Sequence, residues 1–237
     1  MVLPRGVRKA YPSHAMNTAS ISAPRYTISE GARLARTSPQ NVRRWLLGYR
    51  APGHKMEPVL GERAKSDTQL LSFLDVCELG VVAAYRKDPG AVPLERLRQA
   101  YDFASRNLGL EHPFASERLR REGGHVLYEF SREHPGPGVL VLDLHGQYVL
   151  PDAVSGVIAQ FEFGAADHLA HRWYLLGRQI PVVIDPERGS GMPTVDGRNL
   201  RADFLTGRWK AGESIAELAE DYELEASVVE AALRAAA

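Results

Sequence analysis

The stretch from Tyr26 to Arg50 constrains the fold most, because it contains two short amphipathic patterns separated by a polar turn. Apolar residues recur three and four positions apart in each pattern, which is the spacing of a helix with one buried face. Ser38 is a good N-cap, Pro39 suits the first position of a second helix, and Gly48 would end that helix. The apolar residues are Ile28, Ala32, Leu34 and Ala35 in the first pattern and Val42, Trp45 and Leu46 in the second. Together these features predict a helix-turn-helix pair.

The second predicted helix also has a polar face, which points outward if Val42, Trp45 and Leu46 are buried. Asn and Gln side chains can pair with adenine edges, and Arg can pair with guanine or hold a phosphate. A helix N-terminus with its capping hydroxyl can also bind a phosphate. The alternative is a helical hairpin with a solvated arginine face. We predict a DNA-binding site formed by Thr27, Ser38, Gln40, Asn41, Arg43, Arg44 and Arg50.

A family resemblance supports the DNA-binding interpretation. The runs Y-T-I-S-E-G-A-R-L and T-S-P-Q-N-V-R-R-W resemble the DNA-binding head of MerR-type winged helix-turn-helix regulators. That resemblance implies that the second helix enters the major groove and that a hairpin wing after it touches the DNA backbone. Residues Tyr49 to Gln69 would supply the wing, with possible turns at Pro52-Gly53 and Leu60-Gly61.

The net charge of zero conceals a strong separation of charge along the chain. Residues 1–50 carry nine Lys or Arg and one acid, Glu30, whereas residues 211–237 carry seven acids and one base, Arg234. A polyanion is attracted to the first end and repelled by the second. The charge distribution therefore favours the N-terminal end as the one that binds nucleic acid.

The rest of the chain predicts a mainly α fold with small β elements, an α+β class. The run Leu70 to Lys87 is apolar on nearly all sides, which indicates a buried or dimer-facing helix with Cys77 as a small core residue. We expect a flexible basic arm over residues 1–24, a winged helix-turn-helix domain with following helices over 25–148, and a C-terminal domain over 149–237. Further helices are expected at Pro93–Leu108, in Glu111–Arg121, and at Pro151–Ile158, Leu200–Lys210, Glu213–Tyr222 and Ala226–Ala235. Strands are expected at Val126–Phe130, Val139–Leu144 and Ile180–Ile184, with a small antiparallel sheet from Phe161, Phe163 and Leu169–Leu175.

The last two predicted helices form a second helix-turn-helix pattern, opened by a capping box of Ser214 and Glu217. Its acids would face phosphates if it bound DNA; they are Glu217, Glu220, Asp221, Glu223, Glu225 and Glu230. We expect this pair to pack in the core of its own domain or to contact a protein.

The C-terminal segment resembles a small domain of formerly unknown function found in bacterial VapB-type antitoxins. The resemblance is carried by PVVIDPERGSGMPTVDGRNL and RWKAGESIAELAEDYELEASVVEAAL. The string G-L-E-H-P-F-A-S-E-R-L from Gly109 to Leu119 is similar to a mycobacterial subgroup of these antitoxins. Matching positions are Asp185, Pro186, Gly191, Pro193, Gly197, Gly212, Ser214, Ile215, Leu218, Asp221 and Tyr222.

This resemblance implies two partners, a PIN-domain ribonuclease toxin and the operator DNA of the antitoxin–toxin operon, so that the pair represses its own operon. We also expect a homodimer, which would place two recognition helices about one helical turn apart on a palindromic site. The family often has Gly-Thr-Arg where this chain has Gly197-Arg198-Asn199. If the family's arginine touches the toxin, Arg198 or Arg201 would take its place here. Inhibition by an arginine in the toxin's metal site and inhibition of toxin assembly both remain open.

No feature indicates an enzyme, a cofactor or a metal. His168 and His171 are three positions apart without a second ligand motif, and we interpret them as surface residues. The chain has no apolar run of membrane-spanning length and no apolar secretory core at its N-terminus, so we expect a cytoplasmic protein. Two alternatives remain: a MerR-like regulator whose C-terminal half senses a small molecule, and a scaffold that binds only proteins.

Overall fold

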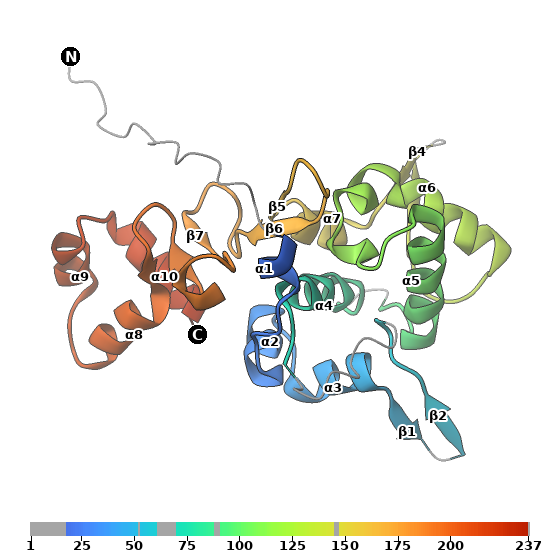
Figure 1. The fold of residues 1–237 in the computed structure, drawn as a ribbon, viewed down its shortest axis with the longest axis horizontal. Helices are drawn as coiled ribbons and strands as arrows, with labels where there is room; N and C mark the ends of the chain where they lie inside the picture. The colour runs from blue at the N-terminus through green and yellow to red at the C-terminus, as the bar shows by residue number, and fades with distance from the viewer. Residues whose placement is uncertain (1–17, 52, 61–69, 88–90, 145–146, 237) are drawn as a thin grey trace.

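The computed structural model describes residues 18–51, 53–60, 70–87, 91–144 and 147–236. Within these ranges helices predominate and the strands form small antiparallel sheets, so the α+β class is confirmed. Helix α4 lies between a C-terminal group of helices at one end of the molecule and helices α5 and α6 at the other (Figure 1). None of the described helices combines the length and apolarity needed to cross a membrane.

The N-terminal region forms three helices and a hairpin. Helix α1 spans Thr18–Ser22, α2 Ile28–Leu34 and α3 Pro39–Leu47, followed by strands β1 (Tyr49–Ala51) and β2 (His54–Met56), which pair antiparallel. The predicted flexible arm is wrong for residues 18–24, because α1 buries Ile21 against the core. Residues 1–17, and the second expected turn at Gly61, lie outside the described residues.

Helix α4, Phe73–Tyr85, is the centre of the hydrophobic core. It begins with a capping box in which Ser72 accepts from the Asp75 N–H and Asp75 accepts from the Ser72 N–H. Every residue of α4 except Asp75 is buried, and elements of the same chain cover it: α1, α2, α7, β6 and the 3-10 helix η2. Burial raises the pKa of the Cys77 thiol well above its ordinary value, which fits the predicted core residue. Contacts within one chain therefore account for the apolar character of α4.

Helices α5 (Leu94–Leu108) and α6 (Glu117–Glu133) pack against each other, with η2 (Pro113–Ala115) between them in sequence. The predicted strand at Val126–Phe130 is wrong, because these residues form the C-terminal half of α6. Leu119, Leu127 and Phe130 share the buried face of that helix. A Cβ on Gly124 would lie 1.8 Å from the Tyr148 carbonyl oxygen. Glycine at this position is therefore required by the close approach of the neighbouring strand.

Two further antiparallel hairpins and a helix follow. Strands β3 (Leu142–Leu144) and β4 (Gln147–Val149) pair, so the strand expected from Val139 is shorter at its start. Helix α7, Asp152–Ile158, packs on α4. Strands β5 (Phe161–Phe163) and β6 (Ala170–Trp173) form the predicted antiparallel pair. His171, in β6, is 5% exposed and contacts Asp167, so its interpretation as a surface residue is wrong.

The C-terminal region contains a three-stranded sheet and three helices. The strand order is β7 (Val182–Val183), β8 (Thr194–Val195) and β9 (Leu200–Arg201), and the 3-10 helix η3 (Gly189–Gly191) precedes β8. Helices α8 (Ala202–Lys210), α9 (Ile215–Asp221) and α10 (Ala226–Ala236) follow, and α10 packs on α8, α9 and the sheet. The capping box at the start of α9 is confirmed.

The second helical pair, α9 and α10, packs within its own domain as predicted. Leu218, Val229 and Ala232 are buried, whereas all six acids named above for this pair are exposed. The pair thus contributes apolar side chains to the core and a negatively charged surface to the C-terminal end of the molecule.

Candidate functional site

Helix α3 has one buried and one exposed face, divided as the sequence predicted. Val42 and Trp45 are 0% and 3% exposed, whereas Gln40, Arg43 and Arg44 are exposed. The buried face packs on α2 and fixes the rotation of α3 about its own axis. The polar side chains of α3 therefore project from a rigid support.

The N-terminus of α3 is ordered by local hydrogen bonds. The Ser38 hydroxyl accepts from the Asn41 N–H at 3.1 Å, and the Asn41 amide donates to the Thr37 hydroxyl at 3.1 Å. Asn41 is half-buried, so its amide is partly used in the turn. Thr27 caps α2 in a similar way, accepting from the Glu30 N–H at 3.2 Å. Thr27 and Ser38, both predicted to contact DNA, are thus exposed N-cap residues of α2 and α3.

The hairpin of β1 and β2 follows α3 directly and is fixed to it. Gly48 has a φ of +70°, and a Cβ there would lie 2.1 Å from the Met56 carbonyl oxygen, so only glycine allows this junction. The Val59 N–H donates to the Trp45 carbonyl at 2.7 Å and anchors the returning segment. Arg44 lies over the Tyr49 ring at 5.3 Å. The hairpin and α3 therefore form one continuous structure.

The cations of α3 and the hairpin lie at one edge of the molecule. Arg43, Arg44 and Arg50 are exposed, and Lys55 on β2 is exposed beside Glu57, at 3.0 Å. Figure 1 shows α3, β1 and β2 together along the lower edge, with the hairpin projecting beyond the other elements. The fold thus brings together all the predicted DNA-binding residues of α3 and the hairpin.

The two arginines expected to contact a partner have different surroundings. Arg198 donates to the Glu223 carbonyl at 3.0 Å. Glu223 lies in the turn before α10 and has a φ of +49°. Arg201 forms an ion pair with Asp203, and its hydrogen bonds lower the pKa of that carboxyl. Arg201 also lies 5.9 Å from the Phe204 ring, which is 63% exposed. Arg198 therefore supports a strained turn, while Arg201, at the end of β9, lies beside the exposed Phe204 of α8.

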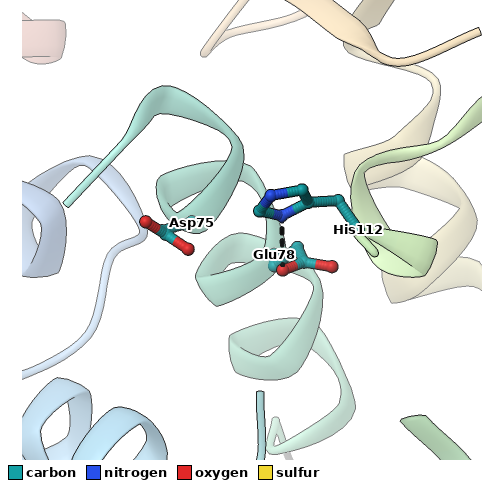
Figure 2. Close-up of side chains that lie close together, drawn as sticks. All are labelled: Asp75, Glu78 and His112. Carbon is teal, nitrogen blue, oxygen red and sulfur yellow. Dashed lines mark hydrogen bonds and ion pairs between the residues drawn. The ribbon is translucent and has the colours of Figure 1, made fainter. Parts of the chain in front are cut away.

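A buried polar cluster that the sequence analysis missed joins α4 to the segment before α6. Glu78 accepts from the Phe114 N–H at 3.2 Å and lies 3.2 Å from His112 Nδ1. Asp75 is one turn earlier on α4, within metal-ligand range of both, but Figure 2 shows no bond from it to either. Its carboxylate instead accepts from the Ser72 N–H and hydroxyl. We interpret the cluster as a buried Glu–His contact that stabilises the core.

These features define a class of protein: a chain with an N-terminal helical pair and hairpin that carry exposed cations, followed by a small C-terminal domain with an acidic surface. Residues 182–235 match a family model described as "Protein of unknown function (DUF433)". This range agrees with the segment in which the sequence resembled an antitoxin domain.

Comparison of the whole chain identifies the family. The chain is 30% identical to "Putative antitoxin VapB45" of Mycobacterium tuberculosis over 84% of its own length and 88% of the relative's. It belongs to this family of VapB-type antitoxins. It is also 26% identical to "Uncharacterized protein Rv2308" of the same organism, over 88% of each chain.

A solved structure has the same fold. The crystal structure of Rv2018 from Mycobacterium tuberculosis superposes with a TM-score of 0.72 at 28% identity, covering 90% of this chain and 99% of that one. The resemblance therefore extends over both the N-terminal helices and the C-terminal domain.

Proposed function

We propose that this protein is an antitoxin that binds and neutralises a PIN-domain ribonuclease toxin and binds operator DNA to repress its own operon. Family membership supports the antitoxin role. The observation that carries the DNA-binding role is the exposed polar face of α3, backed by the buried Val42 and Trp45 and continued by the hairpin. In this proposal the protein acts by binding and not as an enzyme.

The proposed DNA contacts follow from the exposure of each side chain. Gln40 is free to pair with a base edge, and Arg43 and Arg44 can reach a guanine or a phosphate. Arg50 at the start of the hairpin would hold the backbone, as a MerR-like wing does. A homodimer would place two α3 helices about 34–36 Å apart on a palindromic site.

Replacement of Arg43 and Arg44 with Ala tests the DNA-binding proposal. Each lost base contact should weaken operator binding by about 1–3 kcal/mol, while each lost phosphate contact should reduce the salt dependence. Arg106, exposed on α5, provides a control for each single replacement, because Arg106→Ala likewise removes one positive charge but at another site. Equal DNA affinities of the double variant and the wild type, measured by fluorescence anisotropy, would contradict the proposal.

We place the toxin contact on α8. Exposed aromatic and arginine side chains are enriched among residues that dominate binding energy at interfaces. Phe204 and Trp209 are 63% and 48% exposed, and Arg201 lies over the Phe204 ring. Arg201 thereby becomes the better candidate than Arg198 for the family's partner-binding arginine.

Co-expression with the product of the adjacent reading frame tests the antitoxin role. The expected result is a stable complex in pull-down and suppression of that product's ribonuclease activity. Arg201→Ala should weaken the complex without lowering DNA affinity, while Arg198→Ala should mainly destabilise the turn before α10. Tight DNA binding without a complex would instead favour the ligand-responsive regulator.

A further inference from the structure

A cavity of about 360 Å³ lies between α2, at the N-terminal end, and α10, at the C-terminal end. Three arginines line it, Arg33, Arg36 and Arg234, and the remaining lining residues are Leu34, Leu175 and Ala235. None of the described residues that line it carries a carboxylate. Its volume lies within the range of small-molecule sites, which often occur where separate units of a fold meet.

The charges of this cavity are concentrated against an apolar floor. Leu34, Leu175 and Ala235 are all at least nine-tenths buried. Arg33 donates to the Ala236 carbonyl at 2.6 Å and Arg36 to the Leu175 carbonyl at 3.4 Å, and both acceptors are neutral. Like charges that converge repel one another, and an anion between them removes that repulsion.

Arg36 adopts a backbone conformation that favours glycine, and Arg234 is isolated among acidic residues. Arg36 has a φ of +53°, in the left-handed region that favours glycine, within the turn between α2 and α3. Arg234 is the one basic residue of the acidic segment 211–237. Glu230, one turn before Arg234 on α10, is exposed and does not line the cavity. The fold therefore joins a lone C-terminal cation to two cations from the N-terminal helices.

Neighbouring contacts fix the walls of the cavity. The Tyr26 hydroxyl, directly before α2, donates to the Gly191 carbonyl of the C-terminal domain at 2.9 Å. This hydrogen bond is buried, and it adds to the contact between Arg33 and Ala236. Arg33 and Arg36 are thus held beside a preformed space, which lowers the entropy lost on binding.

We propose that this cavity binds a phosphate-type oxyanion through Arg33, Arg36 and Arg234. Planar guanidinium groups match the geometry of phosphate oxygens and donate two hydrogen bonds at once. The phosphate group belongs either to a small phosphorylated molecule or to the backbone of bound DNA. An oxyanion in this position bridges α2, which supports α3, and α10, and so links the two ends of the molecule.

Titration of the full-length protein with inorganic pyrophosphate tests the proposal, with chloride used to keep ionic strength constant. A saturable rise in Tm is expected, on the order of 5 °C at a hundredfold excess over Kd. Arg36→Gln and Arg234→Gln should each weaken pyrophosphate binding at least tenfold by calorimetry, while Arg106→Gln should leave it unchanged. Two results would overturn the proposal: no saturable response up to about 10 mM pyrophosphate, or equal affinity in the wild type and Arg234→Gln.

DNA-binding measurements then distinguish the two sources of the phosphate. If DNA supplies it, Arg234→Gln lowers DNA affinity and pyrophosphate competes with DNA. If a small molecule supplies it, Arg234→Gln binds DNA as the wild type does, while pyrophosphate still raises Tm. The Tm and calorimetry results do not depend on DNA binding, so failure of the operator-binding proposal leaves this test intact.

Discussion

Removal of the Glu78 carboxylate should strongly destabilise the fold, because this side chain is fully buried and serves several donors. The Phe114 N–H lies 3.2 Å, His112 Nδ1 3.2 Å and the Tyr101 hydroxyl 3.4 Å from its oxygens. Glu78→Ala removes the acceptor of the Phe114 N–H and the carboxylate beside His112 in a buried site, while the Tyr101 hydroxyl keeps its 2.9 Å bond to the Glu111 carbonyl. Breaking a buried pair in this way costs about 3–5 kcal/mol.

A more conservative variant separates the roles of shape and charge. Glu78→Gln keeps one carbonyl acceptor, so the Phe114 N–H can remain bonded. The expected loss is about 1–3 kcal/mol, the range for an imperfectly satisfied buried polar group. Glu122→Ala, at an exposed glutamate of α6, is the control and should change the stability little.

Urea unfolding followed by tryptophan fluorescence and circular dichroism measures these differences in the free energy of unfolding. A loss of stability below about 1 kcal/mol for Glu78→Ala would refute the reasoning, since leaving a buried polar group unsatisfied costs more than this. Chelation by EDTA tests the alternative that Asp75, Glu78 and His112 hold a metal. The interpretation as a buried Glu–His contact expects no change in the wild-type unfolding midpoint, and a decrease would identify a metal site.

Two further perturbations test other parts of the core. Gly80→Ala should lower stability, because the new Cβ would lie 2.5 Å from the buried Trp173 ring. The cost of this overpacking, about 2–3 kcal/mol, exceeds the gain in helix propensity of about 1 kcal/mol. A raised Tm of the variant would contradict this prediction. For Asp167, burial raises the pKa, but hydrogen bonds from His171 and the backbone outweigh it and lower the pKa below 3.8. Its ionised form therefore adds stability above pH 3.8, and this stability is lost as the pH falls. Asp167→Asn should lower Tm at neutral pH and have the Tm of the wild type in acid. A difference in Tm that stays constant over this pH range would contradict the prediction.

Local sequence signals predicted the elements near the proposed DNA-binding face well. Ser38 and Gly48 mark the ends of α3 through hydrogen bonds that involve only neighbouring residues. The same holds for Ser214 at α9 and for Gly109, which ends α5 in the left-handed conformation. Such signals can be read from sequence because their physical cause lies within a few residues.

Features that depend on distant contacts could not be predicted in this way. The need for glycine at position 124 comes from the approach of Tyr148, which is 24 residues away and leaves no trace in the local pattern. The alternation within Val126–Phe130 fits a strand, but these residues form part of α6, which packs on α5 through its buried face. The basic cavity joins Arg33 to Arg234, which no spacing rule connects.

The separation of charge makes a quantitative prediction about DNA binding. Four cations lie on α3 and the hairpin with exposed side chains: Arg43, Arg44, Arg50 and Lys55. If each contacts one phosphate of B-DNA, the slope of log Kobs against log salt is about −3.6 per subunit. Any of the four that reads a base instead reduces the magnitude of the slope and adds sequence specificity.

Titration of a labelled operator fragment at 50 to 300 mM salt measures this slope. For a scaffold that binds only proteins, the magnitude of this slope would be below about 1, because no cationic surface would displace counterions from the DNA phosphates. The acidic face of α9 and α10 cannot supply the slope, since its glutamates repel phosphates at every salt concentration. Neutralisation of Glu217 and Glu220 by Gln should therefore leave the slope unchanged, while Arg43→Ala should reduce its magnitude by about 0.9 if this arginine holds a phosphate. The opposite pattern would place the DNA on the C-terminal pair and contradict the assignment of α3.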